Sequence, residues 1–167
     1  MSMKQRHILF SLVVVSALAI TTVVASADSS NFVAPLKARE EVQTPAVISN
    51  AAGVSTLTVA KDGDSLSYRL IVANIDDVLF SHIHCGLAGL NGPVVAFLYP
   101  GPTVSPKGVL ATGTIRDADV IDRPDSAACP GGVSGLDDLL AKVESGGAYV
   151  NVHTVVYPMG EVRGQIR

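Results

Sequence analysis

VSTLTVAKDGDSLSYRLIV, residues 54–72, is the most informative stretch of the 167-residue sequence for the fold. Residues 54–60 alternate with a period of two, and both they and residues 66–72 are rich in β-branched and apolar side chains. Asp62-Gly63 lies between the two runs, and this dipeptide favours a tight turn. The stretch therefore predicts a β-hairpin.

Further short runs with strand character lie on both sides of this hairpin. They cover residues 32–42, 78–84, 93–98, 109–116, 148–155 and 161–166. Proline-, glycine- or aspartate-rich segments separate most of them, as expected for surface loops. The first run contains Pro35, which has no N–H to donate, so we expect an edge strand or an irregular beginning there.

One segment has helical periodicity. Apolar residues at positions 136, 139, 140 and 143 form a single stripe on a helix predicted over residues 136–145. Ser134 is the expected N-cap, and Gly146 is expected to end the helix.

Seven or eight short strands and one helix predict an all-β fold. The expected architecture is an antiparallel, Greek-key-like β-sandwich with a short helix near residues 135–145. An open barrel is the alternative.

The N-terminus has the pattern of a Sec-type signal peptide. Lys4 and Arg6 precede an apolar run over residues 8–24, and Ala25-Ser26-Ala27 forms an A-x-A cleavage pattern. We expect a cleaved signal over residues 1–27 and one β domain over residues 28–167, secreted or held at the cell envelope. An uncleaved membrane anchor is the alternative, although this run of 17 residues is barely long enough to span a bilayer.

Charge and motifs exclude several functions. The chain has 12 basic and 15 acidic residues, and without Lys4 and Arg6 the balance is 10 minus 15, or −5. No basic cluster remains to bind nucleic acid. The sequence has no G-x-S-x-G, H-E-x-x-H, Walker A or EF-hand motif, so we expect no enzyme.

Two cysteines, Cys85 and Cys129, remain after signal cleavage. An even count in an oxidising compartment predicts a disulfide between them. The alternative is a Cys85 thiolate that binds a metal beside two histidines.

Three histidines remain, in residues 81–86 (SHIHCG) and 149–154 (YVNVHT). Alternate residues of a strand share a face, so His82 points the same way as His84, opposite Ile83. His153 would join them if the two strands are neighbours. Such a set suits Cu or Zn, with Glu161, or less favourably Asp76 and Asp77, as supporting carboxylates.

The histidines have a simpler alternative role, which is to bond backbone carbonyls and fix the adjacent loops. A Cu/Zn superoxide dismutase-like site is a remote alternative, because its copper needs four histidines and only three are available. Glu161 and Arg163, two residues apart, are expected to form a cross-strand ion pair.

These segments also resemble the CHRD (chordin-type) domain. Residues 36–45 (LKAREEVQTP) are similar to the family's opening strand, and residues 81–95 to its His-Ile-His and Asn-Gly-Pro-Val signature. Residues 149–165 resemble its closing signature. The resemblance runs in order over residues 31–167.

The resemblance implies an extracellular, β-rich domain without an assigned activity. Chordin itself carries further modules that this chain lacks, so its growth-factor binding is not transferred. The sequence therefore predicts an exported, non-catalytic binding or structural module with an unknown protein or envelope partner. A histidine site for Cu or Zn is the alternative function.

Overall fold

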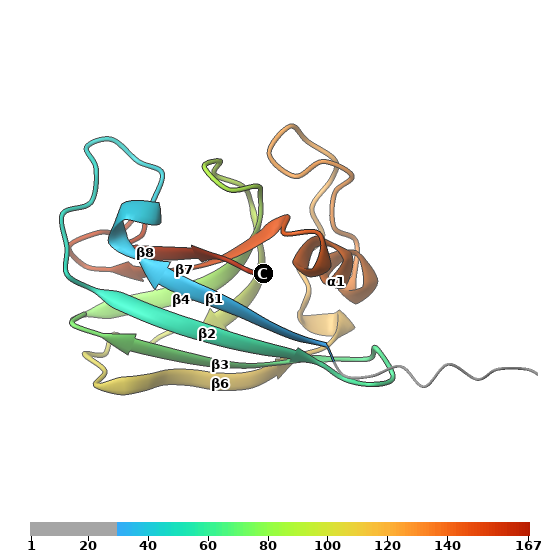
Figure 1. The fold of residues 1–167 in the computed structure, drawn as a ribbon, viewed down its shortest axis with the longest axis horizontal. Coiled ribbons are helices and arrows are strands. Elements are labelled where there is room, and N and C mark those ends of the chain that lie inside the picture. Colours follow the sequence, from blue (N-terminus) through green and yellow to red (C-terminus); the bar gives the residue numbers. More distant parts are fainter. Residues whose placement is uncertain (1–29) are drawn as a thin grey trace, which may run out of the picture.

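The structure is a computed structural model that describes residues 30–167 (Figure 1). In chain order, its strands and its α-helix are β1 Asn31–Lys37, β2 Ala52–Val59, β3 Leu66–Ala73, β4 Val78–Cys85, β5 Val94–Tyr99, β6 Gly108–Ile115, α1 Leu136–Glu144, β7 Ala148–Thr154 and β8 Val162–Gln165. Short 3-10 helices lie at Ala38–Glu40 and Asp117–Asp119. The predicted signal peptide, residues 1–27, lies outside the described residues.

The predicted hairpin is formed by β2 and β3. Val59 pairs with Leu66, and the antiparallel register continues to Ala52 and Ala73. The turn depends on Gly63, which adopts a φ of +77° that side chains disfavour.

All pairs of neighbouring strands are antiparallel, in one sheet of order β5-β4-β7-β8-β1-β2-β3-β6. The sheet curls until β4, β5 and β7 lie behind β1, β2 and β3, nearly closing a barrel (Figure 1). The all-β, antiparallel class with one short helix is confirmed. The two facing layers expected of a sandwich are halves of one continuous sheet, which approaches the open-barrel alternative.

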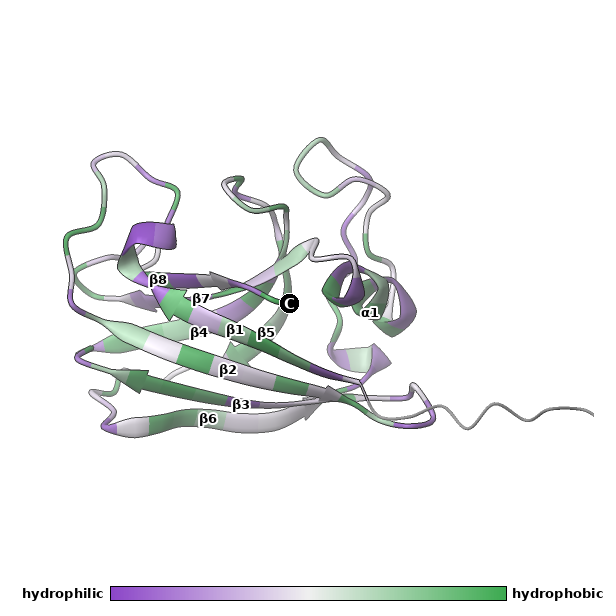
Figure 2. Ribbon diagram, in the orientation of Figure 1, coloured by the Kyte–Doolittle hydropathy of each residue, from purple (hydrophilic) through white to green (hydrophobic). Residues whose placement is uncertain are grey.

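The apolar core lies inside this curl. Apolar and polar residues alternate along the second half of β2 (Figure 2), as expected for a strand with one buried face. Leu57, Leu70, Ile83 and Val150 are fully or almost fully buried and belong to one core cluster.

The edge-strand prediction for Pro35 is wrong, because β1 lies between β8 and β2. Val33 exchanges two backbone hydrogen bonds with Arg167, so the backbone of Pro35, two residues further, also faces the β8 side. The paired contact of β1 with β8 is limited to Lys37 and Arg163. Pro35 therefore occupies a sparsely bonded part of the ladder, where its missing N–H is tolerated.

Helix α1 has the predicted buried stripe, but its N-terminus is capped differently. The backbone N–H of Leu136 donates to Oδ1 of Asp117 at 2.8 Å, whereas Ser134 hydrogen-bonds Asp138. The Ser134 N-cap prediction is thus wrong, because Gly135 is the N-cap residue and a carboxylate from a distant segment accepts the first N–H of the helix. Gly146, at φ +70°, ends the helix as predicted. In residues 30–167, no helix is long and apolar enough to span a membrane.

Candidate metal centre

Strands β4 and β7 are neighbours, and their register brings the two histidine segments together. His82 pairs with Asn151, and His153 pairs with Phe80. Because alternate residues share a face, His82, His84 and His153 all lie on the side of the sheet opposite Ile83. One potential ligand nitrogen from each of the three histidines lies within 4.8 Å of the other two.

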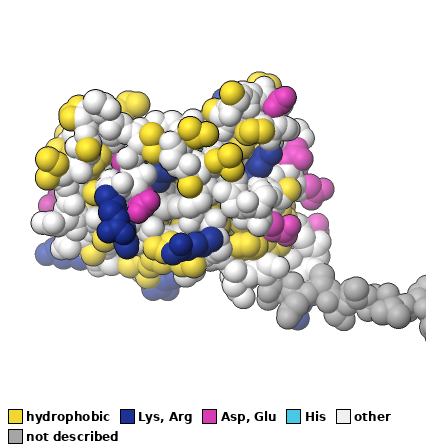
Figure 3. Space-filling view, turned by 45° about the horizontal axis from the view of Figure 1, so that its top comes forward, with side chains coloured by type: hydrophobic (Ala, Val, Ile, Leu, Met, Phe, Trp, Pro, Cys, Tyr) yellow, Lys and Arg dark blue, Asp and Glu magenta, His cyan; other side chains and the backbone are white. Residues whose placement is uncertain are grey.

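The histidine triad, His82, His84 and His153, is buried although it lies outside the apolar core. Its members are only 6–8% exposed. The loops after β1, β4 and β7 are joined by hydrogen bonds next to this face. The Asn91 side chain donates to the carbonyl of Val42, and the Gln43 side chain donates to the carbonyl of Gly160. In Figure 3, where the top of Figure 1 is turned forward, no histidine is visible on the face shown.

Two backbone carbonyls orient the imidazoles. Nδ1 of His84 lies 2.8 Å from the carbonyl oxygen of Gly92, and Nδ1 of His153 lies 3.0 Å from that of Pro158. A carbonyl only accepts, so each Nδ1 carries the proton and, in the neutral ring, Nε2 carries a lone pair. This arrangement is the usual support for a metal-binding histidine.

The remaining ring nitrogens of the triad have no clear hydrogen-bond donor. Nδ1 of His82 and Nε2 of His84 are buried without a hydrogen-bond partner. Nε2 of His153 lies 3.0 Å from Oδ1 of Asn151, which is an acceptor unless the amide turns its NH₂ group inward. Buried polar atoms are nearly always satisfied, so these orphaned nitrogens require an explanation.

The triad is uncharged at neutral pH. Burial, reinforced by the neighbouring His153 and His84, lowers the pKa of His82 to about 3. Burial lowers the pKa of His84 to about 4 despite the bond to Gly92, and it also lowers the pKa of His153. Neutral imidazoles are the form that binds metals.

Aromatic rings surround the triad. Phe97 meets the His82 ring edge-on at 4.5 Å between centroids, and Phe80 lies 4.8 Å from His153. Tyr149 stacks on His84 at 4.7 Å, and the Arg163 guanidinium carbon lies 3.4 Å from the Tyr149 ring centroid. A column of Arg163, Tyr149 and His84 therefore crosses from β8 to β4.

The predicted Glu161–Arg163 ion pair is wrong. Glu161 accepts hydrogen bonds from the hydroxyls of Ser49 and Thr154. Arg163 instead donates to Asn91 and to the carbonyls of Leu87 and Leu90, so it holds the β4–β5 loop. Within the described residues, the potential ligand group contains the three histidines and none of the carboxylates considered, Glu161, Asp76 and Asp77.

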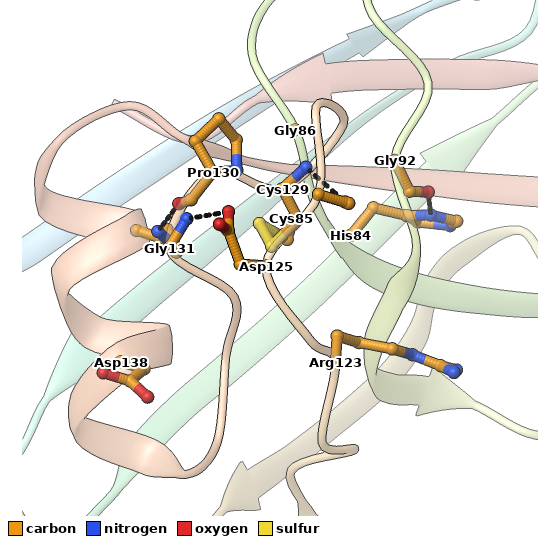
Figure 4. Close-up of a disulfide and its surroundings, with 12 residues drawn as sticks. His84, Cys85, Gly86, Gly92, Arg123, Asp125, Cys129, Pro130, Gly131 and Asp138 are labelled. Carbon is orange, nitrogen blue, oxygen red and sulfur yellow. Dashed lines mark hydrogen bonds between the residues drawn. A yellow bond between two sulfur atoms is a disulfide. The ribbon is translucent and has the colours of Figure 1, made fainter.

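The predicted disulfide between Cys85 and Cys129 is present (Figure 4). It joins Cys85, which directly follows His84 at the end of β4, to the loop before α1. Both cysteines are buried, and neither is free. The alternative of a Cys85 thiolate as metal ligand is therefore wrong.

Sequence comparison identifies the family to which these histidine segments belong. The family model described as "CHRD domain" matches residues 32–166, nearly the whole chain. The chain belongs to the CHRD domain family. No curated protein and no solved structure gives a match.

The CHRD domain is not a known enzyme family. Several residues around the triad of this CHRD domain were not predicted from the sequence. Tyr149 and Arg163 lie in the closing segments that resemble the family. Each alternates with a valine, Val150 or Val162, and this alternation could have indicated that both side chains lie on the same face of the sheet as the histidines. Gly92 and Pro158 act through backbone carbonyls, for which residue type gives no signal.

Proposed function

We propose that this CHRD domain is an exported, non-catalytic module that binds a copper or zinc ion through His82, His84 and His153. The observation that carries the proposal is the pair of buried, unpartnered ring nitrogens on His82 and His84. A metal ion would satisfy both and would also face Nε2 of His153. The simpler role, fixing loops, accounts for the Nδ1 bonds of His84 and His153 but leaves these nitrogens unexplained.

The distances support the proposal. Imidazole nitrogens bind zinc at about 2.0–2.1 Å, so two ligands of one ion are at most about 4.2 Å apart. One ring nitrogen from each histidine lies within 4.8 Å of the other two, and small ring rotations would bring such a set into range. The two carbonyl bonds already select the tautomer that binding requires.

A non-catalytic role fits the same surroundings. Three histidines are fewer than a dismutase-type copper site needs, and the triad is enclosed by aromatic side chains. Neither feature favours turnover of a substrate at the ion.

Titration of the purified, metal-free protein with Cu and Zn tests the proposal. We expect 1:1 binding with a Kd below micromolar for at least one of the two, and its loss in His82→Ala/His84→Ala. The matched control is Asp62→Asn/Asp64→Asn, which removes two possible ligands from the hairpin turn and should leave binding unchanged. Binding weaker than micromolar, or equal binding by the histidine variant, would refute the site.

Export is tested separately by the mass of the protein recovered from the producing cells. Cleavage after Ala27 predicts a mature chain that begins at Asp28. A full-length chain in the membrane fraction would instead support the anchor.

A further inference from the structure

We infer that the histidine triad selects Cu(I) over Zn(II) and other divalent ions. The inference rests on the proposed metal-binding function and specifies which ion the site takes. Three features carry it: the charge of the ligands, the burial of the site and the position of Arg163.

The ligand set brings no negative charge to the ion. Within the described chain, the potential ligand group consists of three imidazoles. The carboxylate of Glu161 is engaged by two hydroxyls, and Cys85 is in a disulfide. A bound ion would therefore retain its full formal charge in this site.

Burial makes that charge costly. The three histidines are almost completely removed from solvent. In a continuum description the cost of burying an ion rises with the square of its charge, so a divalent ion costs about four times as much as a monovalent one. A neutral, buried ligand set therefore favours the monovalent ion.

Arg163 adds to this preference. Its guanidinium lies over Tyr149, which in turn stacks on His84, so a positive charge lies close to the proposed ion. The repulsion on a divalent ion is twice that on a monovalent ion. Glu41 offsets the positive charge of Arg163 only partly, because burial raises the pKa of Glu41 to about 7 and leaves it partly protonated at neutral pH.

Coordination number points in the same direction. Zinc sites are almost always four-coordinate, with water as the fourth ligand when the protein supplies three. Cu(I), a d¹⁰ monocation, is stable with three nitrogen ligands. Phe80 and Phe97 place ring centroids 4.5–5.2 Å from the imidazoles of His82 and His153, so apolar walls enclose the triad.

Competition titrations of the purified protein measure the preference. Cu(I) is supplied anaerobically as its acetonitrile complex against bicinchoninate, and Zn(II) against a chromogenic chelator at the same pH. We expect Cu(I) to bind at least about 100-fold more tightly than Zn(II). Equal or tighter binding of Zn(II), dependent on His82 and His84, overturns the inference but leaves the proposed function intact. Binding of Cu(II) alone likewise overturns only the inference, and binding of none of the three ions overturns both.

Asn151→Asp tests the charge argument directly. The substitution is nearly isosteric and places a carboxylate where Oδ1 now lies 3.0 Å from Nε2 of His153. We expect it to tighten Zn(II) binding more than Cu(I) binding and to reduce the Cu(I)/Zn(II) ratio at least about tenfold. A ratio that stays unchanged would show that charge does not set the selectivity.

Discussion

Glu41 is a partly buried carboxyl group, and few contacts compensate for its loss of solvent. Its Oε1 has no hydrogen-bond partner, and it packs so closely on Gly160 that a Cβ there would lie 2.5 Å from this oxygen. Burial raises its pKa to about 7, and the charge of Arg163 opposes the shift. The folded protein therefore favours the protonated form of Glu41.

We expect Glu41→Gln to stabilise the protein at high pH. The stability that protonated Glu41 contributes is complete below the unfolded pKa of about 4.5 and is lost as pH rises through 7. At pH 8 the variant should exceed the wild type by roughly 2 kcal/mol in free energy of unfolding, and at pH 4.5 by about zero. Urea denaturation at both values checks this, with the exposed Glu40→Gln as matched control. Equal differences at the two pH values would contradict it.

The triad should respond to pH in the opposite direction. In the metal-free protein, the pKa values of His82 and His84 are about 3 and 4, against 6.5 when unfolded. Between these limits the unfolded chain binds more protons, so stability falls as pH decreases from about 6.5 towards 4. From pH 7.5 to 4.5 we expect a loss of a few kcal/mol that is mostly absent in His82→Leu/His84→Leu. The same acid sensitivity in that variant, measured with a chelator present, would assign the loss to other groups.

At the scale of elements, several strands and the helix could be predicted from the sequence, because the spacing of apolar residues indicates which face of an element is buried. The hairpin, the strand containing His82 and His84, and the apolar stripe of α1 follow from alternation or helical spacing. The role of Pro35 and the cap of α1 could not be predicted, because both depend on partners far along the chain: Arg167 and Asp117.

The capping of α1 gives a prediction at this scale. Asp117→Ala removes the acceptor for the N–H of Leu136 and should cost about 1 kcal/mol, the usual value of a helix cap. Ser134→Ala should cost less, because its hydroxyl bonds only the exposed Asp138 carboxylate. Thermal or urea unfolding of both variants compares them. A larger loss for Ser134→Ala would restore the cap expected from sequence.

At the scale of the whole molecule, the curvature of the sheet and its loop cover were not predictable. A sandwich and a nearly closed barrel present the same alternation of apolar and polar residues, since both bury one face of each strand. The convergence of the histidines could be anticipated only on the condition that β4 and β7 are neighbours. The loops that bury the triad meet through contacts such as Asn91 to Val42, which join residues far apart in sequence.

The disulfide is expected to stabilise the whole molecule. It closes a 44-residue span, and the chain-entropy description gives about 3–4 kcal/mol for a loop of this size. Cys85→Ala/Cys129→Ala should lower the free energy of unfolding by about this amount in urea denaturation. A thiol assay on the unreduced wild-type protein should find none. Two reactive thiols would contradict the pairing.

The position of that disulfide also bears on when the domain matures. Cys85 follows His84 directly, so oxidation fixes the end of the strand that carries two members of the triad. Disulfides persist in oxidising compartments and are rare in the cytosol. For an exported chain, the final shape of the triad would therefore be reached only after translocation. The domain would acquire its ion from the surroundings into which it is released, not from the cytosol in which it is synthesised.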